Sequence, residues 1–121
     1  KEFVEKAISI IENEMTNNQF NVKILASKMA MSPSTFLRKT KGITGMTCDQ
    51  FIRSIRLKRA ANFLSNTKTP VKEISFIVGF SSQKHFSTTF KKSFGISPTN
   101  YHKKYFKANK ESFEKTNRKV V

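Results

Sequence analysis

Short polar and cationic side chains gather on one face of a helix that the sequence predicts around Phe86, Phe90 and Phe94. These rings are spaced by four residues, so they share a face that we expect to be buried. The opposite face then presents hydroxyl, amide and ammonium groups, which hydrogen-bond to base edges and to phosphate oxygens. A shift of 50 residues finds a matching face on an earlier helix. The expected base-reading residues are Ser34, Thr35, Leu37, Arg38, Gln83, Lys84, His85 and Thr88, and the expected phosphate contacts are Ser32, Lys39, Lys41, Arg56, Lys58, Lys72, Ser82, Ser87, Lys91 and Lys92.

Arg38 is the strongest single candidate for reading a base, because its forked guanidinium can pair with the acceptors of guanine. Its counterpart in the second face is Thr88, which reaches less far and can offer a hydroxyl group or contact a thymine methyl group. The two faces are therefore predicted to read different sequences. Leu37 is an apolar residue on an outward face, so it is either partly buried or in contact with a thymine methyl group.

Few residues of the chain could catalyse a reaction. His85 and His102 are the only histidines, and together with Cys48 they lack the spacing typical of a metal site. Asp49 and Glu73 are too isolated in the sequence to suggest an acid–base pair. We interpret His85 as a residue of the second outward face and His102 as a surface residue of the last helix. The sequence predicts no enzyme, no metal and no cofactor.

The charge of the chain favours a polyanionic partner. The formal net charge is +15, and between residues 15 and 110 only Asp49 and Glu73 oppose 18 Lys and Arg residues. Such a field attracts nucleic acids. A membrane surface fits poorly because the basic residues are spread over several helices, and RNA fits poorly because the Phe residues are expected to face inward instead of stacking on bases. Double-stranded DNA is the predicted partner, and a binder that does not distinguish bases remains an alternative.

The elements that position these residues repeat about fifty residues apart. The first parts match at an offset of 49: Val22, Leu25, Met29, Ala30, Met31 and Ser32 with Val71, Ile74, Val78, Gly79, Phe80 and Ser81. The second parts match at an offset of 50: Phe36, Thr40, Gly45, Met46 and Thr47 with Phe86, Phe90, Gly95, Ile96 and Ser97. Each copy predicts a short helix, a tight turn and a second helix, which is the helix-turn-helix pattern.

Local signals give the helix boundaries and an all-α fold. We expect an opening helix over 2–15, a helix capped by Asn21, and a helix that starts at Ser32-Pro33 and ends near Lys41 at Gly42 and Gly45. Later helices are expected after the capping box of Thr47 and Gln50, after Pro70, and at Ser97-Pro98. The predicted organisation is a first helix-turn-helix subdomain with its opening helix at 1–46, a linker helix at 47–65, a second subdomain at 66–107 and a disordered tail at 108–121.

Over roughly residues 4 to 106 the sequence resembles the AraC/XylS family of bacterial transcription regulators. Its linker-like residues are Ile55, Arg56, Leu57, Ala60 and Leu64, joined through Thr44-Gly45 and Phe51-Ile52. The most specific part runs through Gly79-Phe80-Ser81-Ser82-Gln83, Phe86, Phe90, Phe94-Gly95, Ser97-Pro98 and Tyr101.

The resemblance implies seven helices in two subdomains joined by a linker helix. Each subdomain would place a recognition helix in one of two successive major-groove faces, about 34 Å apart. It also implies an activator that contacts RNA polymerase and a sensing domain elsewhere in the chain. Thr88 departs from the Arg that is common in the family, which puts the specificity of the second subdomain in doubt. Lys39 and Thr40 depart from a more usual apolar pairing, which is expected to loosen the first subdomain.

The remaining features concern compartment and context. The single cysteine, Cys48, fits a reducing cytoplasm, and no apolar run approaches the length of a membrane span. The chain begins with Lys1, so we expect a piece of a larger protein. Its arrangement resembles the output domain of a response regulator or hybrid two-component protein, with an N-terminal sensing or receiver domain outside this chain.

Overall fold

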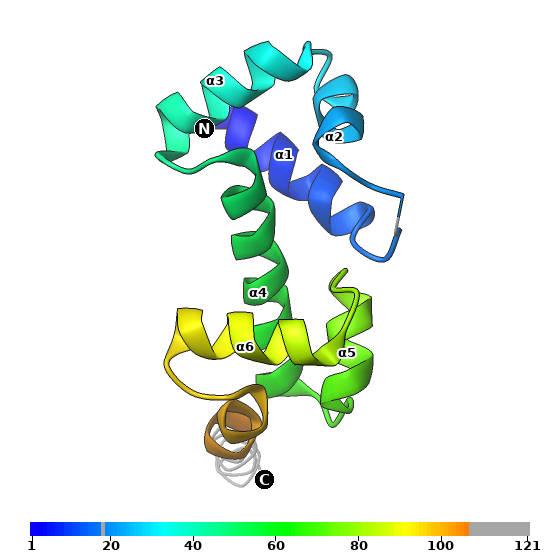
Figure 1. Cartoon of the computed structure of the whole chain (residues 1–121), viewed down its shortest axis with the longest axis vertical. Coiled ribbons are helices and arrows are strands. Elements are labelled where there is room, and N and C mark those ends of the chain that lie inside the picture. The colour runs from blue at the N-terminus through cyan, green and yellow to red at the C-terminus, as the bar shows by residue number, and fades with distance from the viewer. Residues whose placement is uncertain (18, 107–121) are drawn as a thin grey trace, which may run out of the picture. The chain divides into compact units, whose positions relative to one another are not determined.

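The computed structural model describes residues 1–17 and 19–106, which form helices joined by short turns (Figure 1). Six helices are followed by a helical segment over 98–106, so the expected all-α fold with seven helices is confirmed. The tail expected at 108–121 lies outside the described residues. The six bounded helices are α1 (Glu2–Asn13), α2 (Val22–Lys28), α3 (Pro33–Thr44), α4 (Cys48–Asn66), α5 (Val71–Ile77) and α6 (Gln83–Phe94).

The chain divides into two compact units, Lys1–Lys58 and Arg59–Val121, and α4 contributes residues to both. In the first unit α2 packs against α1 and α3, and in the second unit α5 packs against α6. Each of these pairs joins a helix of 7 residues to a helix of 12 residues. The duplication in the sequence is therefore a duplication of one helix-turn-helix structure.

Side chains cap α2 and α3 at the predicted positions. The Asn21 side-chain oxygen accepts a hydrogen bond from the backbone N–H of Ile24 at 2.9 Å, at the start of α2. The Ser32 hydroxyl accepts from the backbone N–H of Thr35 at 3.3 Å, at the start of α3. Each bond satisfies a donor that has no partner in the first turn of its helix.

The third helix is longer than predicted. The expected end near Lys41 is wrong, because α3 continues through Gly42 to Thr44 and ends at Gly45. Gly45 has a φ of 75°, a left-handed conformation that glycine adopts without a steric penalty. A glycine inside a helix weakens it but does not end it, so Gly42 alone was a poor stop signal.

The capping box at the start of α4 is confirmed. The backbone N–H of Thr47 donates to the side-chain oxygen of Gln50 at 3.0 Å, and the backbone N–H of Gln50 donates to the Thr47 hydroxyl at 3.2 Å. This reciprocal pair satisfies two donors at once. The helix runs from Cys48 to Asn66, one residue later at each end than the expected 47–65.

The structure corrects the register of the repeat at one residue. The Ser82 hydroxyl accepts from the backbone N–H of His85 at 3.1 Å and caps α6, as Ser32 caps α3. The structural counterpart of Ser32 is therefore Ser82, whereas the sequence alignment paired it with Ser81. The extra residue of the second copy lies before the cap, and from the cap onward the offset is 50.

The core of the first unit contains α1 and α3. The rings of Phe3 and Phe36 lie 5.6 Å apart between centroids, and Phe36 is completely buried. Lys39 places its ammonium 5.1 Å from the centroid of the Phe3 ring. Thr40 is also completely buried, and among the described residues its hydroxyl has no hydrogen-bond partner. The polar substitution that the sequence showed at position 40 therefore lies inside the core.

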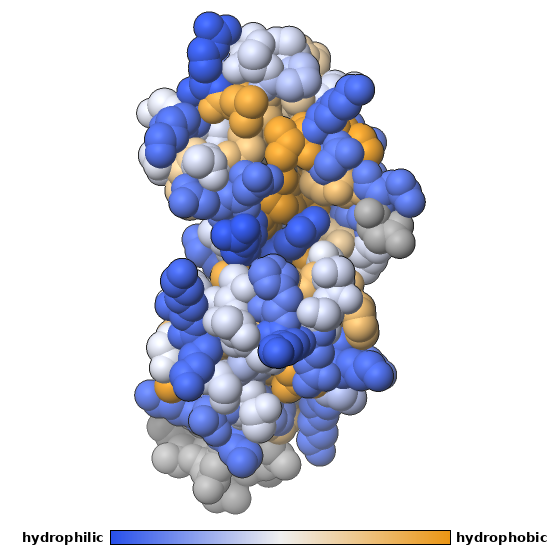
Figure 2. Space-filling model, in the orientation of Figure 1, coloured by the Kyte–Doolittle hydropathy of each residue, from blue (hydrophilic) through white to orange (hydrophobic). Residues whose placement is uncertain are grey.

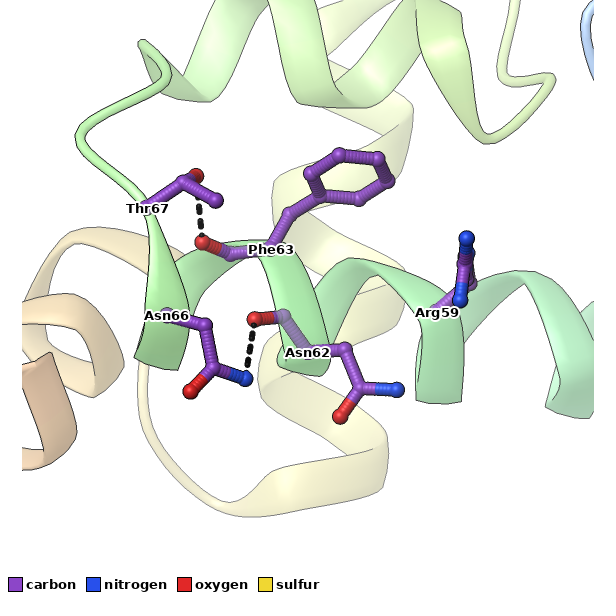
Figure 3. Close-up of a pocket in the computed structure, with 5 residues that line it drawn as sticks. All are labelled: Arg59, Asn62, Phe63, Asn66 and Thr67. Atoms are coloured by element: carbon purple, nitrogen blue, oxygen red, sulfur yellow. Dashed lines mark hydrogen bonds between the residues drawn. The ribbon is translucent and has the colours of Figure 1, made fainter. Parts of the chain in front are cut away.

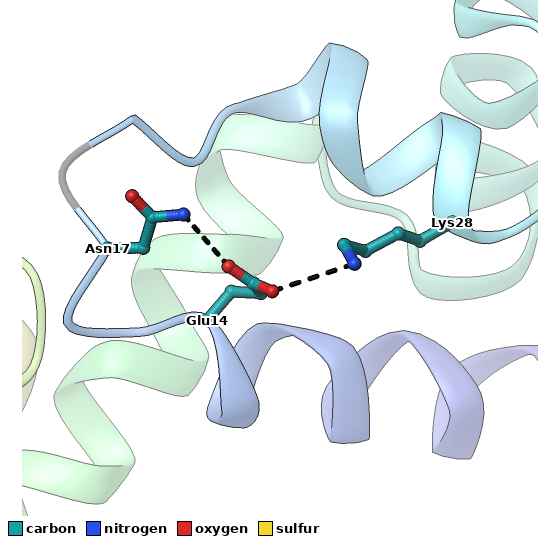
Figure 4. Close-up of polar contacts among 3 residues, drawn as sticks. All are labelled: Glu14, Asn17 and Lys28. Atoms are coloured by element: carbon teal, nitrogen blue, oxygen red, sulfur yellow. Dashed lines mark hydrogen bonds and ion pairs between the residues drawn. The ribbon is translucent and has the colours of Figure 1, made fainter.

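A small polar cluster joins the end of α1 to the end of α2 (Figure 4). The Glu14 carboxylate accepts a hydrogen bond from the Asn17 amide at 2.9 Å and lies 3.6 Å from the Lys28 ammonium. The hydrogen bond from Asn17, together with the charge of Lys28, lowers the pKa of Glu14. These contacts hold the turn between the two helices.

An aromatic cluster forms the core of the second unit. Phe86 and Phe90 are completely buried, as predicted, whereas Phe94 is 36% exposed at the edge of the cluster. The Phe94 ring stacks on Phe90 with centroids 4.4 Å apart, and Tyr101 meets Phe90 edge-on at 5.3 Å. This packing places one face of α6 inward and leaves the opposite face outward.

The segment 98–106 is attached to α4 by a histidine. His102 Nδ1 lies 2.8 Å from the backbone carbonyl oxygen of Leu64, and because a carbonyl only accepts, the imidazole N–H donates. The His102 ring also stacks on Phe106 at 4.8 Å. His102 is therefore a partly buried structural contact on the last helical segment, and it is less exposed than the surface position that the sequence suggested.

Candidate nucleic-acid interface

The outward face of α3 is defined by its buried face. Phe36 and Thr40 point into the core, and the helical period of 3.6 residues places Ser34, Arg38 and Gly42 on the other side. All three are exposed. The Arg38 guanidinium has no hydrogen bond or ion pair with any described residue, so its donors are available to a partner. We call Ser34, Arg38 and Gly42 the α3 stripe.

Hydroxyl groups are held in place beside this stripe, at the start of α3. The Ser32 hydroxyl donates to the Thr35 hydroxyl oxygen at 2.9 Å while it accepts from the Thr35 backbone N–H. The Ser34 hydroxyl oxygen lies 3.5 Å from that of Ser32. Because the Ser32 proton is directed at Thr35, the Thr35 proton is free to point outward to an acceptor.

Leu37 lies on the flank of the same helix and is 46% exposed. It is therefore not a core residue, although the sequence left partial burial open. An exposed leucine beside Arg38 offers the kind of apolar surface that a thymine methyl group contacts.

The outward face of α6 has a different composition. Lys84, Thr88 and Lys92 occupy the positions that Ser34, Arg38 and Gly42 occupy in α3, and all three are exposed. We call them the α6 stripe. Figure 2 shows hydrophilic side chains over much of the visible face of each unit.

The other predicted residues of the second unit lie close to this stripe. Gln83 and His85 are exposed in the first turn of α6, and Ser87 is partly buried. The His85 ring lies 5.5 Å from the Phe80 ring between centroids, which restricts its motion. Ser82, the capping residue, precedes them.

The predicted phosphate contacts fall into two groups. Lys58, Lys72, Lys91 and Lys92 are exposed and can reach a phosphate without giving up another contact that the structure shows. Lys39 and Lys41 are exposed but already engaged: Lys39 lies over the Phe3 ring at 5.1 Å, and Lys41 donates to the backbone carbonyl of Gly45 at 3.0 Å.

Arg56 differs from the other predicted phosphate contacts because it is partly buried in α4. Its Nε atom is buried and has no hydrogen-bond partner among residues 1–17 and 19–106. Burial, together with the nearby charge of Arg53, lowers the pKa of the Arg56 guanidinium. A partly buried arginine packs its stem within the unit, so only its outer nitrogens are available to an anion.

A shallow hollow of about 360 Å³ lies in the second unit between Arg59, Asn62, Phe63, Asn66 and Thr67 (Figure 3). The Arg59 guanidinium lies 5.6 Å from the centroid of the Phe63 ring. The lining of the hollow contains no carboxylate, thiol or imidazole for catalysis. Elsewhere in the described chain, no three His, Cys, Asp or Glu side chains come together as a metal site requires.

The exposed stripes, and not a pocket, are therefore the candidate site. Within each unit the structure places the predicted base-reading residues on or beside one outward stripe. Gly42 was not among the predicted contacts, because a glycine in the sequence signals a helix end; in the structure it lies in α3, four residues after Arg38. None of the helices in the described part of the chain has the length and apolar character that crossing a bilayer requires.

Known proteins share this arrangement. The family described as "Helix-turn-helix domain" matches residues 25–104. The C-terminal domain of AraT, a response regulator from Geobacillus stearothermophilus, is 30% identical with a TM-score of 0.74, and the match covers 85% of each chain. The DNA-binding domain of AdpA, a global transcriptional factor solved in complex with a target DNA, is 26% identical with a TM-score of 0.75, covering 84% of this chain and 91% of that one.

A curated relative extends the similarity to a much longer protein. "Histidine kinase P4" of Formosa agariphila is 39% identical over 105 residues, which is 87% of this chain and 8% of that protein. Because the match covers so little of the kinase, its name carries no enzymatic activity to this chain. The chain also spans only 27% to 37% of the curated transcription regulators that it matches. The chain belongs to the AraC family as a helix-turn-helix DNA-binding domain of transcriptional regulators.

Proposed function

We propose that this domain binds double-stranded DNA at specific sequences, with α3 and α6 as its two recognition helices. The observation that carries the proposal is that both 12-residue helices bury one face and leave an exposed polar and cationic stripe on the other. A net charge of +15 supplies the attraction to phosphates. The complex of the AdpA domain with a target DNA supports DNA binding by a domain of this fold.

The two stripes have separate roles in this proposal. Arg38 reads a base, and Ser34, Thr35 and Leu37 contact base edges beside it. In the second unit Gln83, Lys84, His85 and Thr88 contact bases. The proposed phosphate contacts are Ser32, Lys39, Lys41, Arg56, Lys58, Lys72, Ser82, Ser87, Lys91 and Lys92.

The domain would serve as the output part of a longer, signal-responsive activator in the bacterial cytoplasm. The response regulator and the long kinase among its relatives support this context. We propose that RNA polymerase is a partner and that the domain organisation is 1–46, 47–65 and 66–107. Transcription from a promoter that carries the bound site should rise when the domain is added to purified polymerase, and repression would contradict the activator assignment.

Selection from a random duplex pool tests sequence-specific binding directly. Two short motifs about one helical turn, or 10–10.5 base pairs, apart should be enriched. If the protein retains duplexes from the pool but enriches no sequence, the domain binds DNA without distinguishing bases, and the proposal of sequence-specific binding is wrong.

A further inference from the structure

An exposed glycine lies inside α3 without a reason in the fold. Gly42 lies within the helix, is not among the glycines with positive φ, and is solvent exposed. A Cβ atom added at this position would meet nothing within 4 Å, so no neighbour in the domain requires its absence. Glycine in a helix interior lowers stability relative to alanine. A larger residue such as alanine at this position would therefore make the isolated domain more stable.

The position of Gly42 relates it to the α3 stripe. It follows Arg38 by four residues, so it lies one turn further along the same outward face. Its counterpart in the second unit is Lys92, which shows that the helix-turn-helix structure itself accepts a long side chain there. Of these two equivalent positions, only the one in the first unit is a glycine.

The residue beside Gly42 provides a second observation. Lys41 donates a hydrogen bond to the backbone carbonyl of Gly45 at 3.0 Å. This contact holds an ammonium group at the last turn of α3, where unpaired carbonyls would otherwise repel an anion. The end of α3 therefore combines an absent side chain with a fixed positive charge, a combination that suits a closely approaching phosphodiester chain.

We propose that Gly42 is the point at which the sugar–phosphate wall of the major groove passes against the backbone of α3, and that it is a specificity-determining residue. The inference rests on the proposed function. The first turns of a recognition helix contact base edges, so the wall is expected beyond them. Contact at Gly42 sets how deeply α3 enters the groove, and that depth determines whether the Arg38 guanidinium reaches a base.

The second unit contacts its groove differently in this account. The Lys92 side chain separates the backbone of α6 from the sugar–phosphate wall of the groove, so α6 enters its groove less deeply than α3 does. A shallow helix with the short Thr88 side chain at its centre is suited to fewer base contacts than α3, which presents Arg38 at the same place.

Gly42→Ala and Gly42→Lys test the proposal on the whole 121-residue chain, with the duplex most enriched from the random pool as the probe. Both should raise the thermal unfolding temperature, because a helical glycine is removed without a clash. Both should weaken binding of the enriched duplex, by roughly tenfold for Ala and more for Lys. The Lys variant is the sharper test, since an added cation by itself strengthens DNA binding.

Ser9→Lys is the matched control, because it adds the same charge at an exposed position of α1. It should leave binding unchanged or strengthen it slightly. If Gly42→Ala and Gly42→Lys bind the enriched duplex as tightly as the wild type or more tightly, the close approach at Gly42 is wrong while sequence-specific binding stands. If the wild type enriches no sequence, the proposed function fails and this inference fails with it.

Discussion

Arg38 and Thr88 occupy equivalent places in two copies of one structure, yet they can contact DNA in different ways. Both lie opposite a buried face, at the centre of an exposed stripe. A guanidinium can form two hydrogen bonds with guanine, whereas a threonine side chain reaches less far and offers a single hydroxyl group. We therefore expect the first unit to contribute most of the base reading.

Replacement of Arg38 by alanine should lower the affinity for the enriched duplex by about 1–3 kcal/mol and relax the preference at one base position. Fluorescence anisotropy with the enriched duplex and with a scrambled duplex measures both effects. Arg38→Lys keeps the charge but loses the fork, so it should restore binding to the scrambled duplex more than to the enriched one. An equal loss on both duplexes in Arg38→Ala would remove the base-reading role.

Two threonines of α3 offer a matched test of the core. The Thr40 hydroxyl is buried without a partner in the described chain, so Thr40→Val should raise the free energy of unfolding by about 1 kcal/mol. The Thr44 hydroxyl donates to the Thr40 carbonyl at 2.7 Å and accepts from Met46 at 3.1 Å, so Thr44→Val should lower it by about 1 kcal/mol. Urea unfolding measures both, and a destabilised Thr40→Val protein would show that the hydroxyl has a partner.

At the scale of the helix, starts could be predicted better than ends. Asn21, Ser32 and the Thr47–Gln50 pair signal their helices through side chains that bond the first turn, and the structure shows these bonds. The end of α3 was misplaced because two glycines stood three residues apart and only the backbone conformation distinguishes Gly45 from Gly42. The register of the second cap was missed for a similar reason, since Ser81 and Ser82 are chemically identical neighbours.

The corrected register makes a specific prediction about three serines. Ser32→Ala and Ser82→Ala should each lower the free energy of unfolding by about 1 kcal/mol, because each removes the acceptor for a first-turn N–H. Ser81→Ala should have almost no effect, because Ser81 caps nothing. Urea unfolding of the three variants distinguishes the two registers: a loss at Ser81 with none at Ser82 would restore the alignment made from the sequence.

At the scale of the whole molecule, the sequence was informative about the type of fold and the chemistry of the partner. The repeat, the charge and the periodic Phe residues predicted the paired helices and their outward faces. Contacts that depend on folding were not visible. The bond from His102 to Leu64 joins residues 38 positions apart, and the burial of the Arg56 Nε atom depends on packing that no local pattern encodes.

The distribution of charge predicts how binding depends on salt. Lys92 is exposed on the α6 stripe and is assigned to a phosphate, so Lys92→Ala should weaken binding to all duplexes alike. The slope of log K against log salt should become shallower by about one unit. Titrations at several salt concentrations give this slope. Lys6→Ala on α1 is the control with the same loss of charge away from the stripes, and an equal change there would mean that only net charge matters.

We propose that one helix-turn-helix structure is used twice on DNA, with the first copy reading more of the sequence. The most direct measurement is the binding free energy of the wild-type chain for every single base-pair substitution of the enriched duplex. We expect two clusters of sensitive base pairs about one helical turn apart. The loss of binding free energy should be larger in one cluster, and in the Arg38→Ala variant the losses in that cluster should become small. A single cluster, or penalties spread evenly along the duplex, would contradict it.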